Sequence, residues 1–174
     1  MKIRRVVTGH DPDGKAKIAN DTEVDGSSVA LLPGMEFHRL WGADTAPTFP
    51  DDGSPSSVAY FPPVGGFRFG LFTLPPDGAA VGVVDMKVAQ EEAEEKLPGV
   101  IAHLEPDHPG MHTTDTIDFE YVVSGEVWLV LDSGIEVHLR AGDTVVQNGT
   151  RHAWRNKSSE PCQMVVCLIG VRRE

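Results

Sequence analysis

The second half of the chain consists of short strand-like runs that tight, glycine-containing turns separate. These runs are 117–123, 126–132, 135–140, 144–147 and 163–170. The turns between them include Ser124-Gly125, Ala141-Gly142 and Asn148-Gly149. Short strands at this spacing are typical of an antiparallel sandwich or barrel. The pattern therefore predicts an all-β fold for this half.

The first half also favours strands, with a long loop between them. Residues 3–7 and 15–19 are expected to form a hairpin, because the segment between them has proline and glycine in turn positions. Further strands are expected at 29–32, 36–41 and 67–74. Residues 43–66 are rich in Pro, Gly, Ser and Asp, so we expect a loop that Tyr60 and its neighbours pack down.

One short helix is expected between these halves, at residues 88–97. Ala89, Ala93 and Leu97 recur at helical spacing, and glutamates occupy the opposite face. Pro98-Gly99 ends the helix. Such a helix is placed to cover the mouth of a barrel, although its acidic side is most simply a solvated face.

Composition limits the class of protein. A chain of 174 residues is close to one ordinary domain. Its net charge of −11 argues against a nucleic-acid surface, which needs a basic patch. No apolar run approaches the roughly 20 residues that cross a bilayer, and no apolar segment follows the basic N-terminus as in a signal peptide. We therefore expect a cytoplasmic protein with no nucleic-acid or membrane partner.

The chain has two cysteines, Cys162 and Cys167. Their odd separation puts them on opposite faces of a strand, so they cannot bridge each other there. We expect two free thiols, as is usual in a reducing cytoplasm.

Two stretches concentrate residues that carry chemistry. The first, Pro109 to Gly125, contains His112, Asp118 and Glu120. The second, Gly142 to Asn156, contains His152 in the run Gly-Thr-Arg-His-Ala-Trp-Arg-Asn. The function depends on whether these two stretches meet around one site.

The spacing of these stretches resembles that of the cupin superfamily, small jelly-roll barrels that often hold one metal ion. Counting back from Gly125 places Asp118 where the family has Glu, Thr114 in its second His place and His112 in its first. Gly149, His152 and Asn156 match the end of the second motif, with Gln147 in its Pro place. Pro106 replaces the first glycine of the family, and Gly142 stands one residue too close to Gln147.

This resemblance covers about 65–174 and implies the fold. We expect an antiparallel jelly-roll (cupin) barrel at 66–174, with residues 1–65 as an N-terminal strand extension that packs on it. The stretches around His112 and His152 look similar to a subgroup of bacterial single-domain cupins. Cupins commonly pair through their sheets, so the resemblance also implies a homodimer.

Carried over residue by residue, the resemblance implies three metal ligands, His112, Asp118 and His152. Thr114 cannot replace an imidazole. Two histidines and one carboxylate suit non-haem Fe, and would also accept Zn, Mn or Ni. A straight strand would hold residues 112 and 118 roughly 20 Å apart, so the chain must bend, and the segment 114–116 is a suitable turn.

Further side chains are expected to complete the site. Glu120 shares the strand parity of Asp118, so both carboxyls are expected inside, and Glu120 would act as the proton carrier. Thr114, Trp154, Trp128 and Arg68 are the candidates for the substrate pocket. Alternative interpretations are an outward Glu120, an exposed Arg68, and histidines that only hydrogen-bond to Thr114 and Asp118.

These observations lead to two functional hypotheses. The first is a metal-dependent enzyme that acts on a small oxygenated organic compound inside the barrel, a carboxylate or a phenolic compound. Its reaction would be that of a dioxygenase or of a non-redox lyase, isomerase or decarboxylase, between which fold alone does not decide. The second hypothesis is a metal-free barrel that binds or senses a small molecule.

Overall fold

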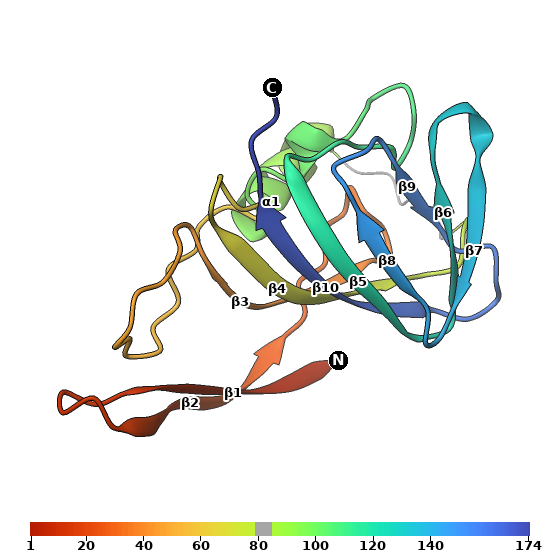
Figure 1. The fold of residues 1–174 in the computed structure, drawn as a ribbon. Coiled ribbons are helices and arrows are strands. Elements are labelled where there is room, and N and C mark those ends of the chain that lie inside the picture. The colour runs from red at the N-terminus through yellow and green to blue at the C-terminus, as the bar shows by residue number, and fades with distance from the viewer. Residues whose placement is uncertain (79–84) are drawn as a thin grey trace.

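The computed structural model describes residues 1–78 and 85–174, which form two antiparallel sheets around one core, with a hairpin projecting from one end (Figure 1). The strands are β1 Lys2–His10, β2 Ala16–Asp25, β3 Glu36–Ala43, β4 Phe67–Leu74, β5 Thr116–Ser124, β6 Glu126–Val130, β7 Glu136–Arg140, β8 Thr144–Gln147, β9 Ala153–Arg155 and β10 Cys162–Gly170. The helices are α1 Met86–Lys96 and two short 3-10 segments, η1 Ile101–His103 and η2 Asp132–Gly134. The predicted all-β architecture of antiparallel strands with one short α-helix is confirmed.

The larger sheet has the strand order β3-β4-β10-β5-β8, and the smaller sheet has the order β7-β6-β9. Every pair of neighbouring strands in both sheets is antiparallel. Side chains of both sheets meet in a single apolar cluster, for example Met164 of β10 and Val127 of β6, each fully buried. The core therefore lies between the sheets, and β5 and β10 run through the middle of the larger one.

Two local expectations differ from the structure. Residues 29–32 form a turn rather than a strand, and from that turn Leu31 and Leu32 pack against the core. An apolar run of this kind predicts a strand, but the turn residues Pro33 and Gly34 follow it directly and redirect the chain before a strand can pair. Strand β9, which has three residues, was not expected because it is too short to show a period.

The hairpin of β1 and β2 pairs with no other strand of the described chain. It is held to β3 by the ammonium group of Met1, 2.6 Å from a carboxylate oxygen of Glu36, and by Arg5, which donates to the Leu40 carbonyl at 3.0 Å. Strand β3 lies inside the expected 1–65 extension, yet it pairs with β4 in the larger sheet. Whether 1–65 and 66–174 behave as separate units stays a prediction.

The expected helix is confirmed in α1, and its apolar face packs inward. Asp85 caps its first turn, and Ala89 and Ala93 are buried, as is Leu97 just beyond its end. Lys96 donates to the Ser28 carbonyl and so ties the helix to the turn before β3. Among the described residues, no helix has the length and apolarity needed to cross a membrane.

The loop at 43–66 is present as expected, and its last part is packed down. The backbone N–H of Tyr60 donates to the Pro98 carbonyl at 2.9 Å, just beyond α1. The rings of Tyr60 and Phe61 pack against the core and against each other, with centroids 5.0 Å apart. Both cysteines are free thiols, as expected.

Candidate functional site

Strand β5 supplies the two acids of the site. Because side chains alternate along a strand, Thr116, Asp118 and Glu120 point into the barrel, and each is at least 94% buried. In the ladder, Asp118 is opposite Leu168 of β10 and Gln147 of β8. Both acids therefore face inward, as predicted, and the alternative of an outward-facing Glu120 is excluded.

The two histidines lie side by side although 40 residues separate them in the chain. His112 and His152 form an isolated antiparallel bridge, in which each backbone N–H donates to the other residue's carbonyl at 2.9 and 3.0 Å. Their ring centroids are 4.2 Å apart. The chain bends at Asp115, so the predicted turn between His112 and Asp118 is present.

The two motif loops are held together by close backbone packing and by one arginine. Gly149 has a positive φ of 58°, and a Cβ there would lie 3.0 Å from the Thr114 carbonyl oxygen. Arg173 donates to the carbonyls of Thr114 and Gly149, at 2.7 and 2.9 Å, and pairs with Asp115. A larger residue at 149 would therefore push the two histidine-bearing segments apart.

Hydrogen bonds fix the same tautomer in both imidazoles. Nδ1 of His112 is 3.0 Å from the Gly110 carbonyl, and Nδ1 of His152 is 2.9 Å from the Thr150 carbonyl. A carbonyl only accepts, so both Nδ1 atoms carry a hydrogen and donate. Each neutral ring therefore presents the lone pair of Nε2, which is the arrangement that metal-ligating histidines use. The alternative in which the histidines bond to Thr114 and Asp118 is not what the structure shows.

Burial controls the protonation of this cluster. It raises the pKa of Asp118 to about 6, and it raises the pKa of Glu120 well above its usual value, with the nearby Asp118 charge as a second cause. Burial also lowers the pKa of His152 to about 4, helped by His112, and lowers the pKa of His112. Both imidazoles are therefore neutral ligands or acceptors near pH 7.

Each acid also has an oxygen without a hydrogen-bond partner. Oδ1 of Asp118 and Oε2 of Glu120 are buried, and neither has a partner in the described residues. Buried polar atoms in native proteins are nearly always paired, so these two oxygens mark positions where a ligand group is expected.

The two histidines and the two acids all line a cavity of about 500 Å³ between the two sheets. The rest of its lining is mostly apolar and aromatic. The aromatic members are Phe37, Tyr60, Phe61, Phe72 and Trp154. A mainly apolar cavity with a few convergent polar groups is the usual form of a small-molecule site.

Tyr60 is a site residue that the sequence interpretation missed. Its ring stands edge-on to Phe37, with centroids 5.7 Å apart and planes at 87°. Burial raises the pKa of Tyr60, and the charges of Glu120 and Asp118 add to this, which places the phenol within electrostatic range of both acids. The sequence predicts that Tyr60 and its neighbours pack the 43–66 loop against the core. Residue spacing alone, however, does not predict that the loop reaches the interior of the barrel.

The other predicted pocket residues have different positions. Trp154 lines the cavity, with its ring edge-on to His152 at 6.0 Å. Thr114 is buried but is not among the residues that line the cavity, and its hydroxyl accepts a hydrogen bond from Thr116 at 2.8 Å. Trp128 lies on the other face of β6, stacked on His138 with centroids 4.1 Å apart, because Val127 and Leu129 take the inward positions.

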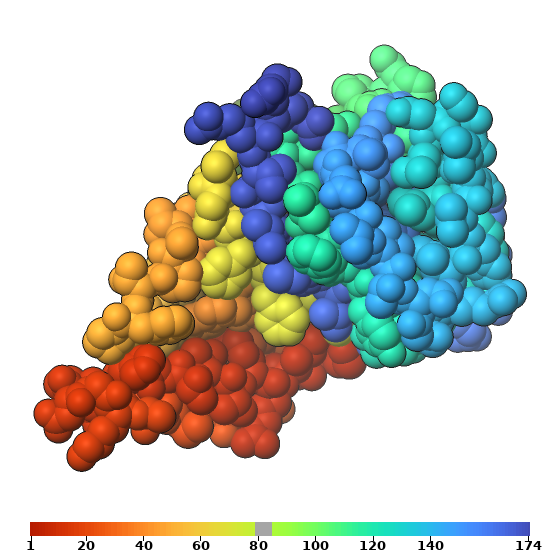
Figure 2. Space-filling view, in the orientation of Figure 1, coloured from red at the N-terminus to blue at the C-terminus, as the bar shows by residue number. Residues whose placement is uncertain are grey.

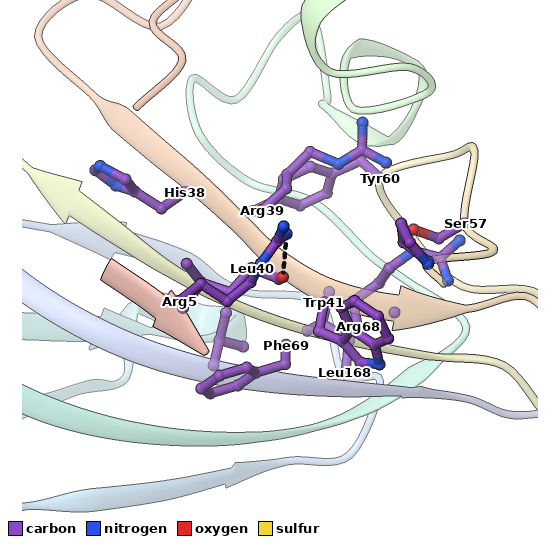
Figure 3. A pocket seen from close by; sticks show the side chains of 14 residues that line it. Arg5, His38, Arg39, Leu40, Trp41, Ser57, Tyr60, Arg68, Phe69 and Leu168 are labelled. Atoms are coloured by element: carbon purple, nitrogen blue, oxygen red, sulfur yellow. Dashed lines mark hydrogen bonds between the residues drawn. The ribbon is translucent and has the colours of Figure 1, made fainter. Parts of the chain in front are cut away.

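Arg68 is buried but lines a second, smaller cavity of about 220 Å³ that Figure 3 shows. It donates to the carbonyls of Ala59, Ala43 and Phe67 and pairs with Asp44 at 2.5 Å, so its guanidinium is fully engaged. In the same view Arg5 reaches the Leu40 carbonyl from the hairpin. The structure therefore does not bring Arg68 to the histidines.

The donor set suits a divalent ion in part. Two imidazoles with free Nε2 lone pairs and the unpartnered Oδ1 of Asp118 are ligands of the kind that Fe, Zn or Mn accept. Over residues 1–78 and 85–174, however, no three His, Cys, Asp or Glu side chains already converge closely enough to hold an ion. The histidine pair is thus in place, and the carboxylate would have to approach it.

Comparison with known proteins agrees with this fold. A family model described as a cupin domain matches residues 100–168. Phomopsin biosynthesis cluster protein D of Diaporthe leptostromiformis is 30% identical over 155 residues, which are 88% of this chain and 70% of that protein. The chain therefore belongs to the cupin superfamily.

Two further similarities extend over most of the chain. The cupin-domain-containing oxidoreductase srdB of Neurospora crassa is 26% identical and aligns with 97% of this chain and 74% of its own length. A solved structure from Thermotoga maritima, described as a predicted oxalate decarboxylase, is 15% identical with a TM-score of 0.46, over 85% of this chain and 94% of that one. Both sequence relatives are fungal, so the narrower likeness to a bacterial subgroup stays a prediction.

Proposed function

We propose that this protein is a metal-dependent cupin enzyme that acts on a small oxygenated organic compound inside the barrel. The observation that carries the proposal is the pair of neutral imidazoles, His112 and His152, which line the same cavity as two buried carboxyls with unpartnered oxygens. The likeness to proteins named cupin-domain-containing oxidoreductases supports an enzyme of the cupin type.

In this proposal His112, His152 and Asp118 hold one divalent ion, of iron, zinc, manganese or nickel. Bound there, the ion would polarise a substrate oxygen as a Lewis acid or activate dioxygen. Glu120 lies one inward position along β5 from Asp118 and moves the proton, since burial raises the pKa of this carboxyl and so favours a form that can hold a proton and donate it. Trp154 closes the wall beside His152.

The experiment is metal analysis of protein purified without chelator, followed by oxygen-uptake measurements. Near-stoichiometric iron with oxygen uptake favours dioxygenase chemistry, whereas zinc or manganese without uptake favours a lyase, isomerase or decarboxylase. We expect His112→Ala and His152→Ala each to weaken metal binding at least 100-fold. His138→Ala is the matched control, because His138 stacks on Trp128 away from the cavity. Equal metal content in all three variants would contradict the proposal.

The alternative is a metal-free barrel that binds or senses a small molecule. The apolar cavity supports it, as does the lack of a converged ligand cluster in the described part of the chain. It predicts protein without stoichiometric metal, and ligand binding that survives substitution of either histidine apart from packing effects.

We also propose a cytoplasmic homodimer that forms through the outer face of the larger sheet. The outer apolar row, Phe69, Cys167, Phe119 and Val146, crosses four neighbouring strands in register. Phe69, Phe119 and Val146 of this row are at least 42% exposed. Figure 2 shows this face uncovered above the N-terminal hairpin. Contiguous apolar surface of this kind usually marks an interaction site.

A further inference from the structure

The two segments that carry the histidines run antiparallel, but the ladder between them is interrupted. Strands β5 and β8 pair regularly as far as Asp118, and the two segments pair again only at the single bridge of His112 and His152. Residues 113–117 and 148–151 form the gap in this ladder, and no backbone hydrogen bond joins them among the described residues. Sheet pairing therefore does not fix the distance between the histidine pair and Asp118.

Arg173 crosses this ladder gap from the segment that follows β10. Its Nη2 atom donates to the carbonyl of Thr114 at 2.7 Å and to the carbonyl of Gly149 at 2.9 Å. Its Nε atom donates to Oδ1 of Asp115 at 2.5 Å. A guanidinium holds its donors in a rigid planar fork, so this one side chain connects both segments at a defined separation.

The backbone around the ladder gap leaves room for the guanidinium. Strand β10 ends beside the start of β5 (Figure 1), and the N–H of Val171 still donates to the Asp115 carbonyl at 2.9 Å, so the chain after β10 stays next to the gap. A Cβ at Gly149 would lie 3.2 Å from Nη2 of Arg173, which is a tight contact. The absence of a side chain at 149 therefore lets the guanidinium reach both carbonyls.

Other polar contacts of these segments lie outside the ladder gap. Arg151 donates to both carboxylate oxygens of Glu105, each at 2.6 Å, and the N–H of Glu105 donates to the Met111 carbonyl. These contacts engage residues that precede His112 in the chain. Among the described residues, Arg173 is the one side chain that joins the two sides of the gap by hydrogen bonds.

We propose that Arg173 is a positioning residue of the barrel site, whose bridge across the ladder gap sets the place of His112 and His152 relative to Asp118. The inference rests on the proposed metal site, in which these three side chains meet at one ion. Metal–ligand distances vary by only about 0.2 Å, so the separation of the segments matters there. Arg173 does not line the cavity and therefore acts through the backbone of the two segments.

The test measures amide hydrogen exchange in metal-free protein and the affinity of the same protein for Zn²⁺ alone, both at pH 7.5. In Arg173→Ala the amides of His112 and His152, which form the bridge, should exchange about ten-fold faster because the segments can separate. The amides of β10 should exchange as in wild type, since a side chain that is 50% exposed adds little to global stability. The affinity for Zn²⁺ should fall about ten-fold.

Two control variants separate positioning from loss of charge and from general destabilisation. Arg172→Ala removes the same charge from the neighbouring exposed residue and should match wild type in both measurements. Arg39→Ala removes another Nη2 that donates to two carbonyls, those of Val58 and Ala59, but in the 43–66 loop. It should leave the two bridge amides and the affinity for Zn²⁺ unchanged.

A conservative variant tests the fork itself. Arg173→Lys keeps the positive charge, but its single nitrogen cannot hold Asp115 and both carbonyls in the geometry of the guanidinium, so it should recover only a small part of each loss. Full recovery by Arg173→Lys would assign the effect to charge and overturn the proposal. Unchanged bridge amides or unchanged affinity for Zn²⁺ in Arg173→Ala would overturn it too, and so would faster exchange throughout β10.

These measurements also separate this inference from the proposed function. A wild-type protein with no affinity for Zn²⁺ or other divalent ions would contradict the proposed metal site. Exchange of the two bridge amides would still decide whether Arg173 holds the histidine pair in place. A protein that binds metal equally well with and without Arg173 keeps the proposed function and loses the inference.

Discussion

Strand β5 turns Asp118 and Glu120 toward the cavity, and Phe119 and Tyr121 toward the outside of the barrel. The two acids are 4% and 6% exposed, whereas the two aromatic residues are 48% and 47% exposed. A half-buried strand normally shows the opposite distribution, with apolar residues inside. The same strand thus has a polar inner face and an apolar outer face.

Each face carries side chains that are unfavourable for the folded chain, so selection for stability alone would not keep them. Buried carboxyls without partners are destabilising, and exposed aromatic side chains invite association. On the inner face, the histidine pair and the aromatic cavity explain the acids as a site. On the outer face, the row that continues through β4, β10 and β8 explains the aromatic side chains as an interface. The placement of acids inside and aromatic side chains outside therefore gives strand β5 two roles: ligand chemistry on its inner face and association on its outer face.

The largest effect is expected from replacing an inner acid by an apolar residue. Glu120→Leu should stabilise the metal-free protein by about 3 to 4 kcal/mol at pH 8, because it removes an unpartnered buried carboxyl and adds apolar burial. Any turnover should be lost at the same time. Denaturant unfolding with circular dichroism measures the change.

The control for this variant is Glu136→Leu. Glu136 is exposed on β7 and pairs with Lys157 at 2.5 Å, so its replacement should change stability by less than about 1 kcal/mol. A Glu120→Leu protein less stable than wild type would show that the carboxyl is satisfied in solution.

The inner face also shows how far sequence could predict this protein. Period-two alternation predicted the strands, and parity placed Asp118 and Glu120 on one face. Spacing against the cupin motifs selected His112 and His152, which the structure joins in one bridge. These inferences succeeded because strand periodicity and motif spacing are local properties of the chain.

The remaining site residues come from contacts that no local pattern encodes. Tyr60 reaches the cavity because its loop is tied to Pro98 beyond α1, 38 residues away in the chain. Arg68 has the inward parity, but Asp44 and three carbonyls hold its guanidinium in a second cavity. Trp128 was placed by adjacency, whereas the burial of Val127 and Leu129 turns it away. In these three residues the contacts of the loop or side chain, rather than strand parity, determine whether the side chain reaches the cavity.

A smaller effect is expected from the pH dependence of the second inner acid. The folded-state pKa of Asp118 is raised to about 6 from 3.8, so its contribution to stability is fully present below about pH 4 and is lost as pH rises through 6. Asp118→Asn removes this loss. Relative to wild type, metal-free Asp118→Asn should therefore gain up to about 3 kcal/mol between pH 4 and pH 7.

Urea unfolding at several pH values measures that gain as a difference between the two proteins. The comparison with wild type is needed because the lowered pKa of His152 acts in the opposite direction, with stability lost as pH falls from 6.5 through about 4. Asp107→Asn, at an exposed position, is the control and should follow wild type. A flat difference for Asp118→Asn would mean that the carboxyl is solvated in the protein.

The smallest effect on chain stability is expected on the outer face. Phe119→Ser replaces a side chain that is already 48% exposed, so the unfolding free energy of the single chain should change by less than about 1 kcal/mol. The oligomeric state should change much more, because Phe119 is central in the outer apolar row. Light scattering over a concentration series should show a dimer for wild type and a monomer for this variant. Phe49→Ser, which alters a phenylalanine 78% exposed in the 43–66 loop, should stay dimeric. If Phe119→Ser also stayed dimeric, the apolar outer face would have no role in association. Only the inward acids of β5 would then have a functional explanation.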